Sequence, residues 1–245
     1  MNCLKFDNLF VSEVAEDISK ENYSFIPGER LANFLSVDDG VVLGFQRHWD
    51  ELVRDCYMED GGQYRYRRYG KFSKLAHQRE FVKAPHAPYV QSSSVNSLNG
   101  DVERIFEPLS DDFIACPLLI DLLMWLADVY DLVEKVPKNW SVCLHPYRIV
   151  ANEMEAGDPT PEGLHRDGVT FIASLMVCRN NVSGGVTKVT DQDKVLLEEM
   201  VLSSPLDIVL ADDEKTMHQV SSVKPLNLED AAYRDVLVIA FTREE

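Results

Sequence analysis

Three side chains in this sequence could bind a metal ion together. His165 and Asp167 are separated by one residue, and His218 follows later in the chain. On an extended strand alternate side chains point to the same face, so His165 and Asp167 would project together while Arg166 points away. A neighbouring strand that carries His218 would add a second imidazole. Two histidines and one carboxylate with open positions beside them are typical of non-haem Fe(II) oxygenases.

The surroundings of the triplet favour this interpretation over a chance pairing. Gly163 and Gly168 bracket it, and a β-rich run follows from Val169 to Val177. His218 lies in another β-type segment, Met217 to Val223. An isolated histidine in such a segment is more often a hydrogen-bonded core residue, so the role of His218 depends on the triplet.

Arg234 is a candidate for binding a carboxylate. It begins the run Arg234-Asp-Val-Leu-Val-Ile-Ala-Phe241, where it would share a strand face with apolar side chains. A guanidinium in such surroundings is costly unless it meets an anion, and its planar fork matches a carboxylate. A salt bridge at the strand edge, to Asp235 or Glu229, explains the residue equally well. The sequence leaves both interpretations open.

Two helices and a series of short strands are predicted to position these residues. Apolar residues recur at helical spacing from Phe45 to Cys56 behind two capping aspartates, and Pro117 opens a second helix with a broad apolar stripe. From Trp140 onward, β-type runs alternate with turn residues, which is typical of a sandwich or jelly roll. These runs are 141–150, 169–177, 185–190, 206–210, 217–223 and 234–241.

Two segments are predicted to be irregular. Gln91 to Ser97 contains a serine cluster, and Glu155 to Glu162 contains Asp158-Pro-Thr-Pro161 and leads into His165. A mobile loop there could act as a lid beside an open metal position, although such a sequence more often forms a plain surface turn.

Composition bounds the class of protein and its partners. A chain of 245 residues with 45% apolar content can bury one sizeable core, and we expect a single domain, 1–245. With 24 basic and 41 acidic residues the net charge is -17, so neither nucleic acid nor a membrane is an expected partner. Five cysteines without a C-x-x-C pair, and no apolar run of signal-peptide or membrane-spanning length, suit a reduced cytoplasmic chain. The oligomeric state is not readable from the sequence.

The order of the motifs resembles a known family. His165-x-Asp167, Gly184-Gly185, Pro205-Leu206, His218 and Tyr233-Arg-Asp-Val-Leu-Val-Ile-Ala-Phe241 follow one another as in bacterial Fe(II)/2-oxoglutarate-dependent dioxygenases that hydroxylate free L-amino acids, the isoleucine 4-dioxygenase type. The resemblance extends from about Arg65 to the C-terminus and is clearest from Leu144 onward. Several spaced elements in one order are more specific than any single motif.

The resemblance implies a mainly β protein with supporting helices: a double-stranded β-helix, or jelly roll, with N-terminal and central helices packed on one side. Residues 1–64 would form a mainly helical support, and 65–245 the catalytic core with an inserted helix at about 117–135. His165, Asp167 and His218 would ligate Fe(II), and the cosubstrate 2-oxoglutarate would reach from the metal to Arg234, with O2 as the oxidant. The wider superfamily often places Ser or Thr two residues after this arginine, whereas Val236 stands here, so a hydroxyl from elsewhere would have to serve.

The resemblance also implies the reaction: hydroxylation of an unactivated C–H bond of a small substrate, a free L-amino acid, with release of succinate and CO2. Such a substrate needs a cation for its carboxylate. Arg65 and Arg67, on one face of a strand, are the first candidates and Arg148 is the second, although surface arginines of an acidic protein explain them equally well. No spacing ranks the possible ammonium partners, which are Asn96, Glu153 and Asp212.

Two other function classes stay open at this point. The same three ligands suit Zn or Mn, so a jelly-roll metal protein with non-oxidative chemistry is one alternative. The other is a non-catalytic binding module in which the His-x-Asp pair is incidental. Which amino acid and which carbon react, and whether hydroxylation, desaturation or cyclisation follows, depends on the shape of the pocket.

Overall fold

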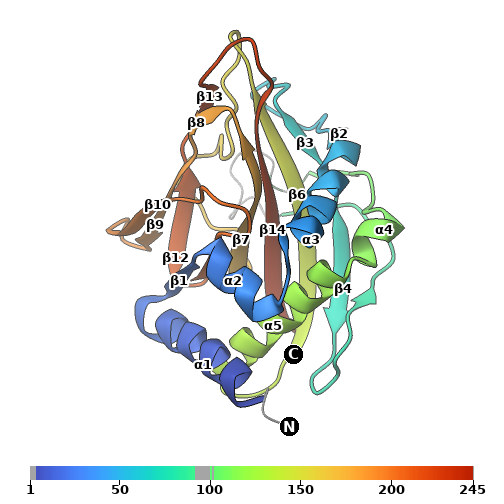
Figure 1. The fold of residues 1–245 in the computed structure, drawn as a ribbon, viewed down its shortest axis with the longest axis vertical. Coiled ribbons are helices and arrows are strands. Elements are labelled where there is room, and N and C mark those ends of the chain that lie inside the picture. Colours follow the sequence, from blue (N-terminus) through green and yellow to red (C-terminus); the bar gives the residue numbers. More distant parts are fainter. Residues whose placement is uncertain (1–3, 92–99, 101, 245) are drawn as a thin grey trace.

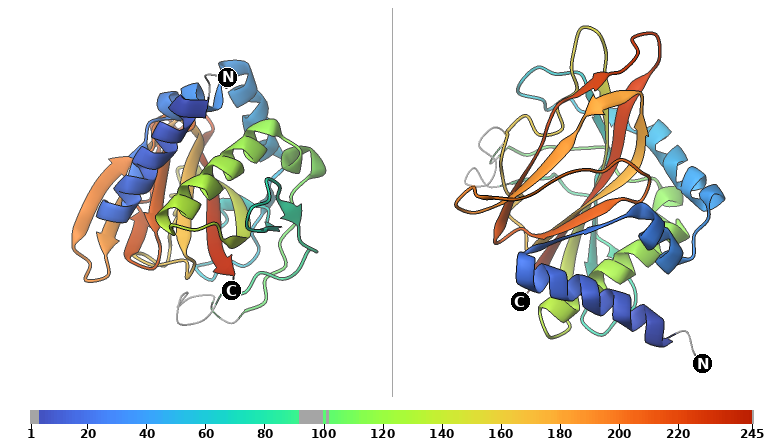
Figure 2. Two further views of the ribbon diagram at one scale, coloured as in Figure 1. Left: turned by 90° about the horizontal axis from the view of Figure 1, so that it is seen from below. Right: turned by 60° about the vertical axis from the view of Figure 1, so that its left-hand side comes forward.

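The structure is a computed structural model that describes residues 4–91, 100 and 102–244. Two layers of antiparallel strands face each other, and the helices cover the outer side of one layer (Figures 1 and 2). This arrangement confirms the predicted jelly roll with helices packed on one side.

The larger layer is a nine-stranded sheet in the described part of the chain. Its order is β1 (Tyr23–Ile26), β11 (Ile208–Asp212), β7 (Phe171–Asn180), β14 (Ala232–Glu244), β6 (Asn139–Ala151), β3 (Arg65–Arg67) and β2 (Val53–Arg54), with β4 (Gly70–Lys74) also on β6 and β5 (Val82–Lys83) on β4. The smaller layer consists of β10 (Leu196–Val201), β9 (Val186–Asp191) and β12 (Thr216–Val220), and of the pair β13 (Val223–Pro225) and β8 (Val182–Gly184).

Helix α5 (Pro117–Val133) anchors the core beneath the larger sheet. Pro117 is tolerated at the first turn because its missing N–H would have no partner there. Tyr130 stacks on Phe171 of β7 with ring centroids 4.4 Å apart, and it meets Phe241 of β14 edge-on at 5.0 Å. The other helices are α1 (Leu4–Glu21), α2 (Gly28–Leu35), α3 (Asp39–Gln46), the 3-10 turn η1 (Arg47–Glu51) and α4 (Asp111–Ile114). None of the described helices combines the length and the hydropathy needed to cross a membrane.

Strand β14 separates the helical core from a cavity. Leu237, Ile239 and Phe241 are buried in the core that the helices cover, whereas Val238 and Ala240 line a cavity between the two sheets. This alternation is the one predicted from the sequence, and it directs every second side chain of the central strands toward the cavity.

The N-terminal region differs from the prediction in the length of one helix. Helix α3 ends at Gln46, one 3-10 turn follows, and the chain is extended from Val53, so the helix predicted to reach Cys56 was wrong in its second half. Tertiary contacts override the helical periodicity here: the Trp49 indole N–H donates to the Tyr147 carbonyl at 3.0 Å, and Val53 pairs with Arg67. The short strands β1 and β2 of this otherwise mainly helical region pair with the larger sheet.

Candidate metal centre and substrate cavity

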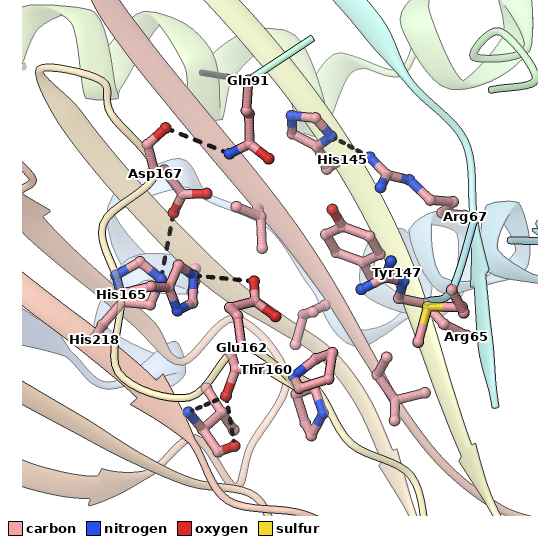
Figure 3. A pocket seen from close by; sticks show the side chains of 18 of the residues that line it. Arg65, Arg67, Gln91, His145, Tyr147, Thr160, Glu162, His165, Asp167 and His218 are labelled. Atoms are coloured by element: carbon pink, nitrogen blue, oxygen red, sulfur yellow. Dashed lines mark hydrogen bonds and ion pairs between the residues drawn. The ribbon is translucent and has the colours of Figure 1, made fainter. Parts of the chain in front are cut away.

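One cavity between the two sheets contains most of the residues that the sequence singled out. It is lined by residues of β3, β6, β12 and β14 and by the segment from Pro159 to Glu162, which the sequence predicts as irregular (Figure 3).

His165, Asp167 and His218 converge at one wall of this cavity. Each offers one donor atom, and these atoms all lie within 4.8 Å of one another. The two imidazole centroids are 4.5 Å apart, and His218 Nε2 is 3.3 Å from Asp167 Oδ2 (Figure 3). Donor atoms at these separations could bind one divalent cation.

The backbone brings the triad together differently from the predicted strand. His165 and His218 form a single antiparallel bridge, with N···O distances of 3.0 and 2.9 Å, and the chain then turns instead of continuing as a strand. The Asp213 carboxylate accepts hydrogen bonds from the backbone N–H of Asp167 at 3.0 Å and of Gly168 at 2.8 Å. The strand prediction was wrong because Asp213 holds these amides in a turn, where Gly168 has a φ of +76°.

The protonation states of the triad suit a divalent metal. His165 Nδ1 lies 2.8 Å from the Gly163 carbonyl, so Nδ1 donates and Nε2 keeps its lone pair. Burial and the neighbouring His165 lower the pKa of His218 to about 3, so this imidazole is neutral. Its Nδ1 is buried and has no hydrogen-bond partner among the described residues. Burial also raises the pKa of Asp167. The neutral imidazole of His218 and the desolvated carboxylate of Asp167 therefore fit an ion such as Fe(II), which would compensate the buried charge.

Arg234 reaches the same cavity and is only 2% exposed. Burial, followed by the charge of Arg179, lowers its pKa to about 10. Its side chain forms no hydrogen bond or ion pair with the residues described, and its Nε is fully buried. The alternative salt bridge is not formed, because Asp235 lies on the other face of β14. There, Asp235 accepts hydrogen bonds from Arg148 Nε and Nη2, both at 2.8 Å. A buried guanidinium without an acidic partner is destabilising unless an anion binds to it, so Arg234 is suited to bind an anion in the cavity.

Arg65 and Arg67 line the wall of the cavity across from His165 and His218 (Figure 3). Arg65 is compensated by the buried Asp55 carboxylate, which accepts from its Nε at 2.9 Å. Arg67 is 3% exposed, and its guanidinium lies between the rings of Phe106 and Tyr147, 3.6 and 4.6 Å from their centroids. Its Nε is buried without a partner among the described residues. Arg67 Nη1 lies 3.8 Å from Asp55 Oδ2, a longer separation than that of Arg65, so the Asp55 carboxylate is shared by two arginines and the buried Nε of Arg67 is left for a ligand.

His145 orients Arg67. Its Nδ1 lies 2.6 Å from Arg67 Nη2. Complete burial, reinforced by the charge of Arg67, holds the pKa of His145 well below its ordinary value. The imidazole is therefore neutral and accepts the guanidinium hydrogen bond.

Arg104 and Glu162 are among the lining residues that were not predicted from the sequence. Arg104 is 3% exposed and its Nη2 donates to Gln91 Oε1 at 3.0 Å. Glu162 carries a carboxylate on the cavity side of the triad, with Oε1 3.5 Å from His165 Nε2. The position of Glu162, three residues before His165, could have drawn attention to it. Arg104 lies in an irregular stretch that gives no periodicity to read.

The structure does not bring Arg148 into the cavity. Along β6 it lies on the face opposite to Tyr147, where it forms ion pairs with Asp235 at 2.8 Å and Asp50 at 3.1 Å. Its position corrects the expectation that Arg148 binds substrate. Of the proposed ammonium partners, Glu153 is exposed and Asp212 pairs with Lys215 at 2.7 Å, while Asn96 lies outside the described residues. Most of the predicted irregular segment Gln91 to Ser97 is likewise outside them.

Comparison with known proteins agrees with the geometry. A family model described as 2OG-Fe dioxygenase matches residues 46–240. The chain is 25% identical to L-isoleucine-4-hydroxylase of Bacillus thuringiensis, over 99% of both proteins. It is 24% identical to 3(1)-hydroxy-L-isoleucine 4-dioxygenase of Pantoea ananatis (strain AJ13355), over 95% of this chain and 96% of the relative.

Solved structures agree as well. A bsmA homologue from Methylobium petroleophilum PM1 superimposes with a TM-score of 0.86 at 30% identity, covering 95% of this chain and 92% of that one. The IDO structure from Bacillus thuringiensis has a TM-score of 0.79 at 17% identity, covering 96% and 100%, which supports the fold. Together these matches confirm the resemblance found in the sequence.

Proposed function

The chain belongs to the 2OG-Fe dioxygenase family, and on this premise we propose that it hydroxylates an unactivated carbon of a free L-amino acid, with release of succinate and CO2. Its family makes it an enzyme that uses Fe(II), 2-oxoglutarate and O2. The two alternatives, non-oxidative metal chemistry and a binding module, are thereby superseded. The names of the curated relatives, a hydroxylase of L-isoleucine and a dioxygenase of a hydroxy-L-isoleucine, support the substrate class.

His165, Asp167 and His218 would hold Fe(II) in this proposal. Bound iron, together with 2-oxoglutarate and O2, supplies the oxidising power that converts a C–H bond into C–OH. The protein keeps the His218 imidazole neutral and fixes the Asp167 backbone through Asp213. It leaves the cavity side of the triad open to cosubstrate and substrate. Arg234 would bind the distal carboxylate of 2-oxoglutarate, since its buried charge has no acidic partner among the described side chains.

The amino acid would lie between the triad and the arginine wall. Arg67, with Arg104 beside it, would bind the α-carboxylate, because Asp55 is hydrogen-bonded to Arg65 and lies 3.8 Å from Arg67 Nη1, so that one carboxylate faces two guanidinium groups. Glu162 would accept the α-ammonium group. Met58, Ile149, Val220 and Val236 add apolar surface for an aliphatic side chain. The observation that carries the proposal is that a metal-ligand set and Arg67, whose buried Nε has no partner among the described residues, face each other across one cavity. A molecule bound by both ends would thus present a central carbon to the metal.

A screen of the common L-amino acids tests the proposal. Purified protein with Fe(II), 2-oxoglutarate and air is expected to release succinate in response to one amino acid or a small group of them. The product should be heavier by one oxygen atom in mass spectrometry. Omission of 2-oxoglutarate or O2 is the control, and neither should leave any turnover. Binding of 2-oxoglutarate without a response to any amino acid would contradict the proposed substrate class and point to a larger or modified substrate.

A further inference from the structure

A second arginine lies directly opposite Arg234 in the larger sheet. In the antiparallel pairing of β14 with β7, the partner of Arg234 is Arg179. Side chains of directly paired residues project to the same face with Cβ atoms about 5 Å apart, and like charges placed there destabilise a sheet. Neither arginine forms an ion pair with any residue in the described part of the chain. An anion that contacts both guanidinium groups would compensate this repulsion, which contributes to the lowered pKa of Arg234.

A β-bulge places Arg179 on the same face of the larger sheet as Arg234, next to Arg234 and behind the residues that line the cavity. The register of β14 and β7 shifts by one residue between Asp235 and Val236: Val236 pairs with Met176, but Asp235 pairs with Cys178. Met176 packs with Val236 on the side of the smaller sheet. Strict alternation from Met176 would have sent Arg179 to the helical side. The extra residue of the bulge reverses this alternation, which is a known way of redirecting a side chain beside a functional site.

The guanidinium of Arg179 is fixed on one edge and unsatisfied on the other. Its Nη2 donates to the carbonyls of Val182 at 3.1 Å and Gly184 at 2.6 Å, whereas its Nη1 is buried and lacks a partner among the described residues. The pair of carbonyls therefore sets the orientation of the fork and leaves one buried N–H edge for a ligand.

Gly185 explains how two arginines fit into this space. A Cβ at this position would lie 2.8 Å from Arg179 Nη1 and 3.3 Å from Arg234 Cδ, and the backbone φ is +68°. Both the conformation and the close approach exclude a side chain. Gly185, the second residue of the Gly184-Gly185 pair that the sequence singled out, thus makes room for the two arginine side chains, whereas Gly184 lies against the Ser222 carbonyl.

We propose that Arg179 and Arg234 together bind the distal carboxylate of 2-oxoglutarate. The inference rests on the role that the proposed function gives to Arg234, and it adds Arg179 as a second cation. The unpartnered donors are Arg179 Nη1 and Arg234 Nε, and a carboxylate has two oxygen atoms to accept from them. Val236, two residues after Arg234, offers no hydroxyl for this task.

The test compares two 2-oxoacids that differ at the distal end. Binding of 2-oxoglutarate and of 2-oxobutanoate, which lacks the distal carboxylate, is measured by calorimetry on the full-length protein loaded with Mn(II), so that no turnover is needed. Arg179→Gln is expected to weaken the binding of 2-oxoglutarate about 10- to 100-fold, as for the loss of a hydrogen bond to a charged group. The binding of 2-oxobutanoate should stay unchanged. Arg179→Lys keeps the positive charge but lacks the planar guanidinium group, so its affinity for 2-oxoglutarate should lie between those of the wild type and of Arg179→Gln.

Lys188→Gln is the matched control. Lys188 lies on β9 of the smaller sheet, pairs with Glu199 at the surface and does not line the cavity, so its loss removes one positive charge without touching the ligand. Unchanged binding of 2-oxoglutarate by the Arg179→Gln protein would overturn the inference. Equal weakening of the binding of both acids would overturn it as well, because it would indicate that Arg179 only helps to fold the turn after β7. If Arg179→Gln unfolds, the Arg179→Lys variant decides by the same comparison. If Arg179→Gln selectively loses affinity for 2-oxoglutarate, but the wild-type protein oxidises no amino acid, the proposed substrate class is refuted and this inference is supported.

Discussion

The carboxylate of Asp213 accepts the backbone N–H of Asp167 at 3.0 Å, and one of its oxygens accepts the next two amides, of Gly168 and Val169, at 2.8 and 2.9 Å. Asp213 is itself completely buried, at 0% exposure. A candidate metal ligand on an irregular segment is thus positioned through its backbone by a residue that does not face the ion. Such supporting contacts commonly change metal affinity by about 10- to 100-fold.

Asp213→Asn should therefore weaken metal binding. The amide keeps the shape of the side chain but presents one N–H₂ group where two carboxylate oxygens accept, so at least one backbone N–H loses its partner. We expect the dissociation constant for Mn(II), measured by calorimetry, to rise by about 10- to 100-fold. Glu214→Gln is the control, because Glu214 lies in the same turn but is exposed and paired with Arg243. This variant should bind Mn(II) with the affinity of the wild type. An Asp213→Asn protein with wild-type affinity would show that the turn does not position the ligand.

His165→Ala tests the metal centre directly. Removing one of three ligands should reduce metal content after anaerobic reconstitution from about one ion per chain to near zero, as measured by elemental analysis, and substrate-stimulated succinate formation should stop. His77→Ala is the control, because His77 is exposed and does not line the cavity. Full metal content in the His165→Ala protein would refute the assignment.

Arg67→Gln separates substrate binding from cosubstrate binding. Loss of the charge should raise the KM for the amino acid by about 10- to 100-fold, since a charge-assisted hydrogen bond is lost, while the KM for 2-oxoglutarate stays within about twofold. Arg54→Gln on the neighbouring strand β2 removes an exposed charge and should change neither value. A parallel rise in both KM values would indicate that Arg67 supports the wall of the cavity instead of binding the carboxylate.

Asp207→Ala is expected to affect stability. Its carboxylate accepts the backbone N–H of Gly28 at 2.8 Å and those of Ser203 and Ser204 at 2.8 Å, tying the start of α2 to the turn before β11. A Cβ on Gly28 would lie 2.8 Å from the Asp207 nitrogen, so the two segments are in close contact and leave no room for a replacement partner.

The free energy of unfolding in urea should therefore fall by about 2–4 kcal/mol in Asp207→Ala, because buried donors lose their acceptor. Asp193→Ala, in the exposed turn between β9 and β10, should stay within about 0.5 kcal/mol of the wild type. A comparable decrease of the unfolding free energy in both variants would mean that the contact of Asp207 with Gly28 does not stabilise the fold more than an exposed aspartate does.

The sequence by itself determined the elements whose pattern repeats locally. The alternation from Arg234 to Phe241 predicted which side chains face the cavity, and the apolar stripe after Pro117 predicted the helix beneath the sheet. The two histidines and the aspartate were recognisable because their types and order restrict the chemistry. These features depend on neighbours in the chain, so periodicity and residue type are sufficient to read them.

Only the tertiary structure decided which polar side chains share the cavity. Arg65 and Arg148 look alike in sequence, yet one lines the cavity beside Asp55 and the other points to the opposite face with Asp235. The reversal of Arg179 requires an unpaired residue in the register of two strands distant in sequence, and the turn at Asp167 requires the carboxylate of Asp213. Register and long-range hydrogen bonds are properties of paired segments, so a pattern read along one segment does not contain them.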